Sequence, residues 1–439
     1  MNLKKMRPEA HVTVYESGRK PLAKVSVTGG GRCNLTNSFE GVRSMESVYP
    51  RGHRLMKRLL REFSHEDTYE WFEHEGVRLV TQYDCCVFPQ SQDAMEIVGT
   101  LTRLMHSRGV KLLTGHRVVD IRPVAAMHAA DAAQHGDGPA APRYTVVAGR
   151  AGQPDGSEVA ADYDVVIVTT GGSPKASGFG MLGSLGVETV SPVPSLFSLC
   201  LPESGITAMT GTVVDNVTAG LAGTKLRASG PLLITHWGMS GPAILKLSSY
   251  AARLLHDGGY KAELSINWLG DASEAEAVET VMELAVRHPQ KHLSSLYPQQ
   301  FNARLWQYLL DSSALNPAMR WAEMGRKGMN RLVNTLVNSR YRVDGKNRFK
   351  EEFVTCGGVS LDMVDSRTLE CRIHPGLYFA GEVLDVDAIT GGFNLQAAWS
   401  MGYVVARAVS TPIILCPRFS MSSSSTGPCM AKAKPPASS

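Results

Sequence analysis

The chain has 439 residues and a formal net charge of +4, with 43% hydrophobic and 20% charged residues, a composition typical of a globular protein of two or three domains. The small net charge argues against a dedicated nucleic-acid binder, and the short, interrupted apolar runs predict no membrane span, so we expect a small-molecule partner. No signal peptide is visible and the eight cysteines form no C-x-x-C pair, which favours reduced thiols in a cytoplasm.

The first strand-like stretch is His11–Tyr15, an alternating run that ends at Glu16. In a dinucleotide-binding domain, an acidic residue that ends the second strand holds the adenosine ribose, so Glu16 is a candidate for this role. The alternative is an ordinary solvated charge. The ten residues before His11 contain neither an apolar strand nor a G-x-G-x-x-G turn. We therefore expect the chain to start within the first βαβ unit, with Asn2–Arg7 as the end of its helix.

A glycine-rich segment, GGGRCN at residues 29–34, follows the apolar run Val25–Val27. Three glycines let backbone amides reach a phosphate or a flavin edge, and Arg32 can add positive charge. A plain glycine turn between two elements is the alternative. Because no neighbouring cysteine completes a C-x-x-C pair with Cys33, a disulfide-reductase mechanism is not expected.

Helical periodicity and short apolar runs alternate from residue 55 to residue 170. Ser64 is a predicted N-cap of a helix that ends before Gly76, and another helix ends before Gly109. Ala125–Pro142 is expected to be a solvated hairpin insertion, although its histidines allow the alternative of a metal site. The expected strands cover 110–113, 118–121, 144–147 and 163–170. The last of these ends at Thr170-Gly171-Gly172, where a cofactor could lie.

From Pro192 the pattern becomes one of short strands, which predicts a β-barrel. The expected strands cover 196–201, 210–217, 225–228, 232–235, 261–267 and 340–343. A helix is expected to start at Pro242, and Ser273 with Glu276 is a capping box for a helix that runs to His288. Helical patterns continue to Asn338. The tail after Ser410 is rich in Ser, Pro and Lys and is expected to be disordered.

The stretch from Gly376 to Gly402 combines a strand, an acidic loop, a glycine pair and a helix start. The strand is Leu377–Ala380, the glycine pair is Gly391-Gly392, and the helical pattern begins at Ala397. A helix start presents free N–H groups and partial positive charge, and glycines let a flat ligand approach the backbone. This order suits a polyhydroxylated, partly anionic cofactor such as FAD, whereas a βα turn without a ligand is the simpler alternative.

This stretch resembles the C-terminal FAD signature of the bacterial NAD(P)/FAD-dependent oxidoreductases, a group that includes dehydro-bile-acid reductase and aminoacetone-oxidase-type enzymes. Three more stretches carry the resemblance: VSVTGGGRCNLTN, VIVTTGGSP and LLITHWGMSGPAIL. The resemblance implies an α/β fold in which a Rossmann-like FAD-binding domain (1–192 and 351–410) is split by two insertions. These are a β-barrel (193–268 and 339–350) and a small helical domain (269–338); the tail is 411–439.

The resemblance also implies an FAD-dependent oxidoreductase that uses NAD(P)H to reduce a conjugated double bond in an apolar small molecule. One alternative is a flavin amine oxidase that uses oxygen. The other is an inactive fragment with a binding or structural role, because a chain that lacks the first strand and glycine turn is expected to bind FAD weakly and to be unstable. The cofactor-binding candidates are Glu16, Gly29, Gly30, Gly31, Arg32, Cys33, Asn34, Thr170, Gly171, Gly172, Gly381, Glu382, Asp385, Gly391, Gly392, Asn394, Gln396 and Ala397.

His236, in the motif THWGMSGP, is the one weak candidate for a catalytic group. It could donate a proton beside the flavin. A structural histidine between the barrel and the cofactor domain is the more common outcome for a single His in a motif. No metal site is expected.

Overall fold

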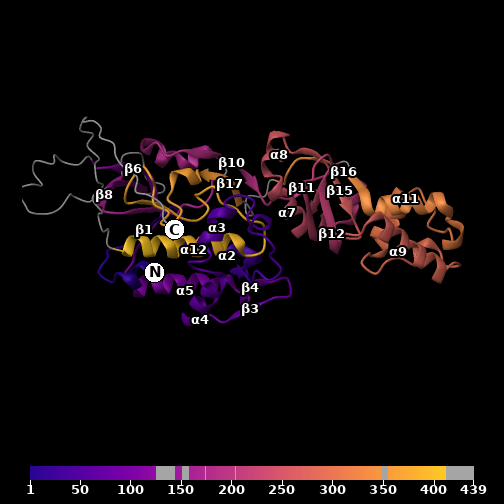
Figure 1. The fold of residues 1–439 in the computed structure, drawn as a ribbon, viewed down its shortest axis with the longest axis horizontal. Coiled ribbons are helices and arrows are strands. Elements are labelled where there is room, and N and C mark those ends of the chain that lie inside the picture. The colour runs from indigo at the N-terminus through magenta and orange to yellow at the C-terminus, as the bar shows by residue number, and fades with distance from the viewer. Residues whose placement is uncertain (125–143, 151–157, 174, 203, 348–353, 412–439) are drawn as a thin grey trace, which may run out of the picture.

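The computed structural model describes residues 1–124, 144–150, 158–173, 175–202, 204–347 and 354–411. The expected hairpin insertion at Ala125–Pro142 and the tail beyond Thr411 lie outside these residues. The molecule is elongated: the N-terminal helix and the last described helix, Phe393–Ser410, lie together in one α/β part, the β-rich insertion adjoins it, and α9 (Glu274–Arg287) and α11 (Gly325–Asn338) lie farthest away (Figure 1). None of the described helices is long and apolar enough to cross a membrane.

The α/β part contains two pairs of parallel strands, and a cofactor is expected at the carboxyl ends of these strands. β1 (Thr13–Glu16) pairs with β5 (Lys111–Thr114), and β9 (Val166–Val168) pairs with β18 (Leu377–Phe379). Each pair forms its own two-stranded sheet. Because the carboxyl ends of paired parallel strands lie at one edge, the segments after β9 and β18 are neighbours.

Helices cover these strands, and most begin and end where the sequence predicts. Ser64 caps α4 with a complete capping box, in which its hydroxyl accepts from the N–H of Asp67. The yellow C-terminal helix α12 lies beside α2 and above α5 (Figure 1). The helices of this part are α1 Asn2–Met6, α2 Ala23–Gly31, α3 His53–Leu59, α4 His65–His74, α5 Ala94–Ser107 and α12 Phe393–Ser410.

Two small antiparallel sheets complete the α/β part. One has the order β2-β4-β3, from Thr36–Asn37, Cys86–Pro89 and Leu79–Thr81. The other has the order β6-β7-β8, from His116–Pro123, Tyr144–Arg150 and Val159–Tyr163. The 3₁₀ helices η1 (Met45–Ser47), η2 (Ala176–Leu185) and η6 (Leu361–Met363) connect these elements.

A six-stranded antiparallel sheet in the order β11-β14-β13-β12-β15-β16 forms the barrel. A bridge between Leu199 and Lys346 brings its two edges together. The expected strands at 225–228 and 232–235 fall in one strand, β13, which pairs with β12 on both sides of a register shift between Val214 and Val217. The strands are β11 Leu199–Cys200, β12 Val213–Leu221, β13 Arg227–Thr235, β14 Gly238–Ser240, β15 Lys261–Asn267 and β16 Ser339–Asp344.

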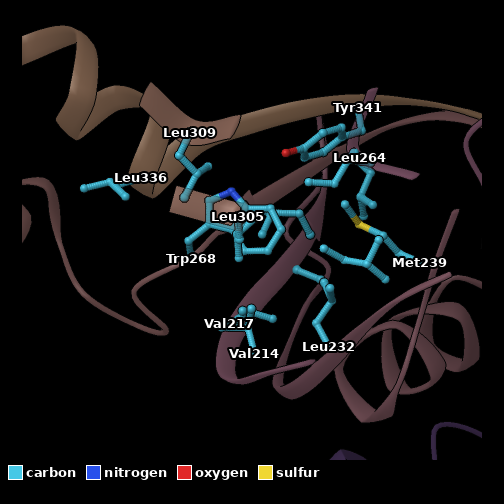
Figure 2. Packing of buried hydrophobic residues seen from close by; sticks show 14 of the residues in the cluster. Val214, Val217, Leu232, Met239, Leu264, Trp268, Leu305, Leu309, Leu336 and Tyr341 are labelled. Carbon is cyan, nitrogen blue, oxygen red and sulfur yellow. The ribbon is translucent and has the colours of Figure 1, made fainter. Parts of the chain in front are cut away.

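Antiparallel strands β10 (Thr189–Ser195) and β17 (Val354–Val359) connect the barrel to the α/β part. The helical insertion shares its core with the barrel: Trp268, Leu305 and Leu336 are fully buried in one cluster (Figure 2). The helices here are α7 Pro242–Tyr250, α8 Ala252–Asp257, α9 Glu274–Arg287, α10 Ala303–Ser312 and α11 Gly325–Asn338, with 3₁₀ helices η3 Gly205–Met209, η4 Leu293–Ser295 and η5 Trp321–Glu323.

Candidate functional site

The loops after β9 and β18 meet at Glu382. Its Oε1 accepts a hydrogen bond from the backbone N–H of Thr355 at 2.7 Å, and its Oε2 lies 3.6 Å from the ammonium of Lys24. A Cβ added to Gly172 would lie 2.6 Å from the Glu382 carboxylate and 2.5 Å from the Thr355 hydroxyl, so only glycine fits. The structure thus joins the predicted residues Gly172 and Glu382, and it adds Lys24 and Thr355, which sequence reasoning missed.

The segment 29–34 turns away from the end of α2. Gly29 has a φ of +62°, and a Cβ there would lie 2.8 Å from the backbone nitrogen of Asn34. Gly30 and Gly31 also have positive φ but face open space. Arg32 lies with its guanidinium carbon 4.4 Å from the centre of the Phe88 ring. Glycines are therefore required here by the backbone, and two of them leave room for an approaching ligand.

The glycine pair Gly391-Gly392 packs against the stretch 34–37. A Cβ on Gly392 would lie 2.2 Å from the Thr36 carbonyl oxygen, and its φ is +88°. In the orientation that satisfies both ends of its amide, Asn34 donates to the Thr36 carbonyl at 3.0 Å and accepts from the Gly392 N–H at 3.3 Å. Asn37 donates to the Gly391 carbonyl at 3.0 Å. The segments around Asn34 and Gly392 therefore form one contact.

Helix α12 begins at Phe393, so the prediction of a helix start at Ala397 is wrong by one turn. The reason is that the first turn carries polar side chains with specific partners, which hides its apolar periodicity. The N–H of Ala388 donates to Asn394 at 2.9 Å, and Asn394 donates back to the Ala388 carbonyl at 3.1 Å. This first turn places N–H groups beside Gly392, where an anion or an electron-rich edge is stabilised.

The candidates in this first turn differ in what their side chains can reach. Gln396 is fully buried, accepts from the Thr36 hydroxyl at 2.6 Å and donates to the Ser64 carbonyl at 3.1 Å. Ala397 is also buried. The side chains of Asn394 and Gln396 thus hold protein segments together, and what this turn offers a ligand is its backbone.

The acidic loop contributes a buried ion pair rather than two solvated carboxylates. The guanidinium of Arg51 contacts Asp387, whose Oδ2 also accepts from the Ser195 hydroxyl at 3.0 Å. Arg51 donates to the Ser249 carbonyl at 2.7 Å, so the pair ties the α/β part to β10 and α7. Burial raises the pKa of Asp387 and of Asp385, and Arg51 acts in the opposite direction on both. Sequence reasoning missed Arg51, because nothing local marks it as a partner of Asp387.

Glu16 and Cys33 are placed differently from each other. Glu16 ends β1, as predicted, and its carboxylate accepts from the N–H of Gly18 at 2.6 Å. One carboxylate can accept several bonds, so this leaves capacity for a ribose hydroxyl. Cys33 is fully buried, and burial raises the pKa of its thiol to about 12. Its thiol is therefore a packing group and is not poised for nucleophilic attack.

His236 is exposed in the turn after β13, where its ring contacts Trp237. Its two sequence-based roles, a proton donor beside the flavin or a structural histidine between the barrel and the cofactor domain, stay predictions.

The residues that the structure brings together fit FAD. Gly172 and Gly392 lie so close to neighbouring groups that a Cβ would displace them, which keeps backbone exposed beside the strand ends and beside the start of α12. Carboxylates at Glu16 and Glu382 suit hydroxyl groups, and helix N–H groups suit a phosphate or an electron-rich ring edge. Within the residues that the structure describes, no group of three His, Cys, Asp or Glu could hold a metal ion.

Comparisons with known proteins agree with this chemistry. A 3-dehydro-bile acid delta(4,6)-reductase of Clostridium scindens is 26% identical over 412 residues, which cover 92% of this chain and 93% of the relative. A ribosomal RNA dihydrouridine synthase of Escherichia coli is 27% identical over 410 residues, covering 90% and 91%. A solved quinol–fumarate reductase with menaquinol molecules aligns over 93% of this chain and 68% of that chain, with 13% identity and a TM-score of 0.44.

The family model described as "HI0933-like protein Rossmann domain" matches residues 2–408, which is most of the chain. The chain belongs to the HI0933-like Rossmann family.

Proposed function

We propose that this protein reduces a carbon–carbon double bond conjugated with a carbonyl group, with NAD(P)H as the electron donor. One observation carries the proposal: two relatives that differ in substrate share this bond chemistry. The name of one describes a delta(4,6)-reductase of a 3-dehydro bile acid. The other is named for dihydrouridine, which is uridine whose ring double bond, conjugated with a carbonyl, has been saturated.

The site supports this chemistry with groups of this chain. FAD held here would supply hydride transfer between the donor and the substrate. The first-turn N–H groups of α12 beside Gly392 would favour negative charge on a ring edge held there. Thr355, Gly172 and Glu382 fix the loops at the strand ends, so the site is preorganised in the protein itself.

The test measures reduction of the flavin by the electron donor separately from its reoxidation by the substrate. Purified protein is loaded with FAD and reduced anaerobically, once with NADPH or NADH and once with dithionite. It is then mixed with a conjugated enone, or with the saturated ketone as the control. We expect one equivalent of enone to restore the oxidised flavin spectrum, whereas the saturated ketone leaves it reduced. If neither compound reoxidises the flavin, but an amine reduces it and oxygen reoxidises it, the protein is an amine oxidase and the proposal is wrong.

A second candidate for the substrate class is RNA, favoured by a row of basic side chains along α3. Arg54, Lys57, Arg58 and Arg61 are exposed and line a surface hollow of about 290 Å³. Arg54, Lys57 and Arg58 lie on one face of α3 at spacings of three and four residues, and Arg61 follows the end of the helix. Glu62, the acid in this hollow, pairs with Arg407. Among the described residues, the four cations have no carboxylate partner.

The proposal of an RNA substrate rests on local charge rather than on net charge. The sequence-based expectation of no nucleic-acid partner rests on a chain total of +4, whereas a phosphate backbone meets only the local charge. Unpaired cations at (i, i+4) repel one another, so this face costs the helix stability unless an anion covers it. The start of α3 also adjoins the acidic loop, because Gly52 packs against Val386.

The RNA hypothesis is tested by removing positive charge from α3 and comparing the result with a control variant. Replacing Lys57, Arg58 and Arg61 with Gln should weaken binding of a uridine-containing RNA and lower the slope of log K against log salt by up to about 2, at roughly 0.7 per lost contact on a single strand. The control replaces Arg326 and Lys327, exposed on α11 at the far end of the molecule. Equal RNA affinity of the two variants would exclude α3 as the RNA-binding face.

A further inference from the structure

β16 is the last strand of the barrel sheet, and no strand of the described residues pairs with its outer edge. The first strand of the sheet, β11, reaches the chain only after β16 has ended. There the N–H of Cys200 donates to the Gly345 carbonyl at 2.9 Å, and Leu199 forms a bridge with Lys346. In the described part of the chain, the barrel wall is therefore open along β16.

The hydrogen bonds of the neighbouring strand show which residues of β16 point to this open edge. The carbonyl of Glu263 on β15 accepts from the N–H of Ala222 at 2.9 Å, so the backbone of Glu263 faces the β12 side and not β16. Glu263 lies opposite Arg342. Opposite residues of an antiparallel pair exchange both bonds or neither, and the two kinds alternate. Arg340, Arg342 and Asp344 therefore direct their N–H and C=O groups out of the sheet.

Two surface hollows, of about 460 and 290 Å³, flank β16, because residues 340–342 line both of them. The larger hollow lies over β15 and β16. The smaller one separates β16 from a wall that contains Pro202, Ser204, Gly205 and Tyr308. A strand added at this edge would direct its side chains alternately to the charged outer face of the sheet and to this wall.

The side chains at this edge favour an acidic partner. Arg340 pairs with Glu263, and the ammonium of Lys261 lies 3.5 Å from the carboxylate of Asp344. Arg342 is exposed, and among the described residues no carboxylate pairs with it. Pairing with the β16 of a second copy, centred on the strand, would set Arg342 against itself or against Arg340, and like charges directly opposite destabilise a sheet. The edge therefore disfavours its own copy and favours carboxylates on an incoming strand.

We propose that the outer edge of β16 binds an extended acidic segment of another protein, which adds a strand to the barrel sheet. The backbone groups of Arg340, Arg342 and Asp344 hold the segment, and its carboxylates lie beside the Arg342 guanidinium. Binding at this edge goes beyond the proposed function and needs neither FAD nor a substrate.

The first test uses a synthetic peptide of six residues, the length of β16, that alternates Glu with Val. Fluorescence anisotropy of a dye at the end of the peptide should show saturable binding, at least about tenfold tighter than that of a peptide alternating Lys with Val. Two more peptides carry N-methyl groups on either the Glu or the Val residues. Because alternate N–H groups of a strand point to opposite sides, one of the two should lose binding and the other should keep it. Equal binding of these two, or no binding of the Glu-Val peptide, would overturn the proposal.

The second test changes the edge itself. Arg342→Gln removes the charge, and Arg342→Pro also removes an N–H that points away from β15, so the bonds within the barrel sheet remain. We expect Arg342→Gln to weaken peptide binding about threefold and Arg342→Pro at least about tenfold. The matched control is Arg326→Gln, an exposed arginine of α11, and thermal unfolding checks that each variant is folded.

Three results of this second test would contradict the proposal. Equal affinity of Arg342→Gln and Arg342→Pro for the peptide would exclude strand addition. Binding of a uridine-containing RNA at this edge in place of the peptide would make it a nucleic-acid face. A wild-type dimer in sedimentation that Arg342→Pro dissociates would assign the edge to a second copy of the chain.

Discussion

In the part of the chain that the structure describes, the buried polar side chains of the barrel and its helical insertion are serines and threonines, whereas those of the cofactor domain include Asn37, Gln396 and Asp387. The barrel core is an apolar cluster in which Trp268, Leu305 and Leu309 interlock with strands and helices (Figure 2). The cofactor domain buries Thr36, Gln396 and Asp387 in hydrogen-bonded contacts between distant segments. A close-packed apolar core stabilises without directing any group, whereas a satisfied polar network fixes the positions of particular atoms. We therefore expect the barrel core to contribute mainly to stability, and the cofactor domain to fix the positions of the atoms in the candidate site.

The largest effect is expected from breaking the buried ion pair. Asp387→Ala leaves the Arg51 guanidinium uncompensated, and loss of one partner of a buried pair costs about 3–5 kcal/mol. The double variant Arg51→Met with Asp387→Leu should recover more than half of that loss in a urea titration. A double variant as unstable as the single one would show that the pair matters for packing rather than for charge.

Truncation of a buried side chain in the barrel core should lower the unfolding free energy without changing the cofactor site. Leu309→Ala removes a fully buried side chain, and we expect a loss of about 2–5 kcal/mol in unfolding free energy. FAD affinity of the folded variant should stay within about twofold, because the cavity lies in the other core. A tenfold fall in affinity would mean that the two parts are coupled and that the comparison above is wrong.

Glu16→Ala tests the predicted ribose contact. Loss of a hydrogen bond to a charged group costs about 1.5–3 kcal/mol, so the FAD dissociation constant should rise about tenfold or more. Gly18→Ala is a useful control, because it crowds the same carboxylate, with a Cβ 3.0 Å from its oxygen, without removing it. An unchanged dissociation constant in Glu16→Ala would remove this residue from the site.

The smallest effect is expected at the cap of α9. Ser273→Ala removes a hydroxyl that accepts from the N–H of Glu276 at 3.3 Å, and such caps contribute about 1 kcal/mol. Thermal unfolding should show a small decrease, with unchanged flavin binding. A decrease as large as that of Leu309→Ala would mean that the helical insertion unfolds as a separate unit and takes the barrel with it.

How much the sequence predicts depends on how local the signal is. The caps at Ser64 and Ser273 are each marked by residues three positions apart, and both helices begin where predicted. The meeting of the loops after β9 and β18 follows from a general property of parallel strands. The contact between Arg51 and Asp387 joins residues 336 positions apart, so no pattern within either segment predicts it.

The start of α12 was mispredicted for a related reason. Its first turn is defined by Asn394 and Gln396, whose polar side chains look exposed in the sequence but bond to Ala388, Thr36 and Ser64 in the interior. Hydrophobic periodicity detects apolar burial and misses polar burial.

The contact between Gly392 and Asn34 is the centre of this account, and FAD titration of matched glycine variants tests it most directly. Gly392→Ala and Gly211→Ala both place a side chain at a φ of +88°, so both carry similar backbone strain. The added Cβ lies 2.2 Å from the Thr36 carbonyl in the first variant and in open space in the second, which is in the barrel part of the chain. The account predicts an FAD dissociation constant at least about tenfold higher for Gly392→Ala than for Gly211→Ala, measured by quenching of flavin fluorescence. Equal constants for the two variants would contradict it.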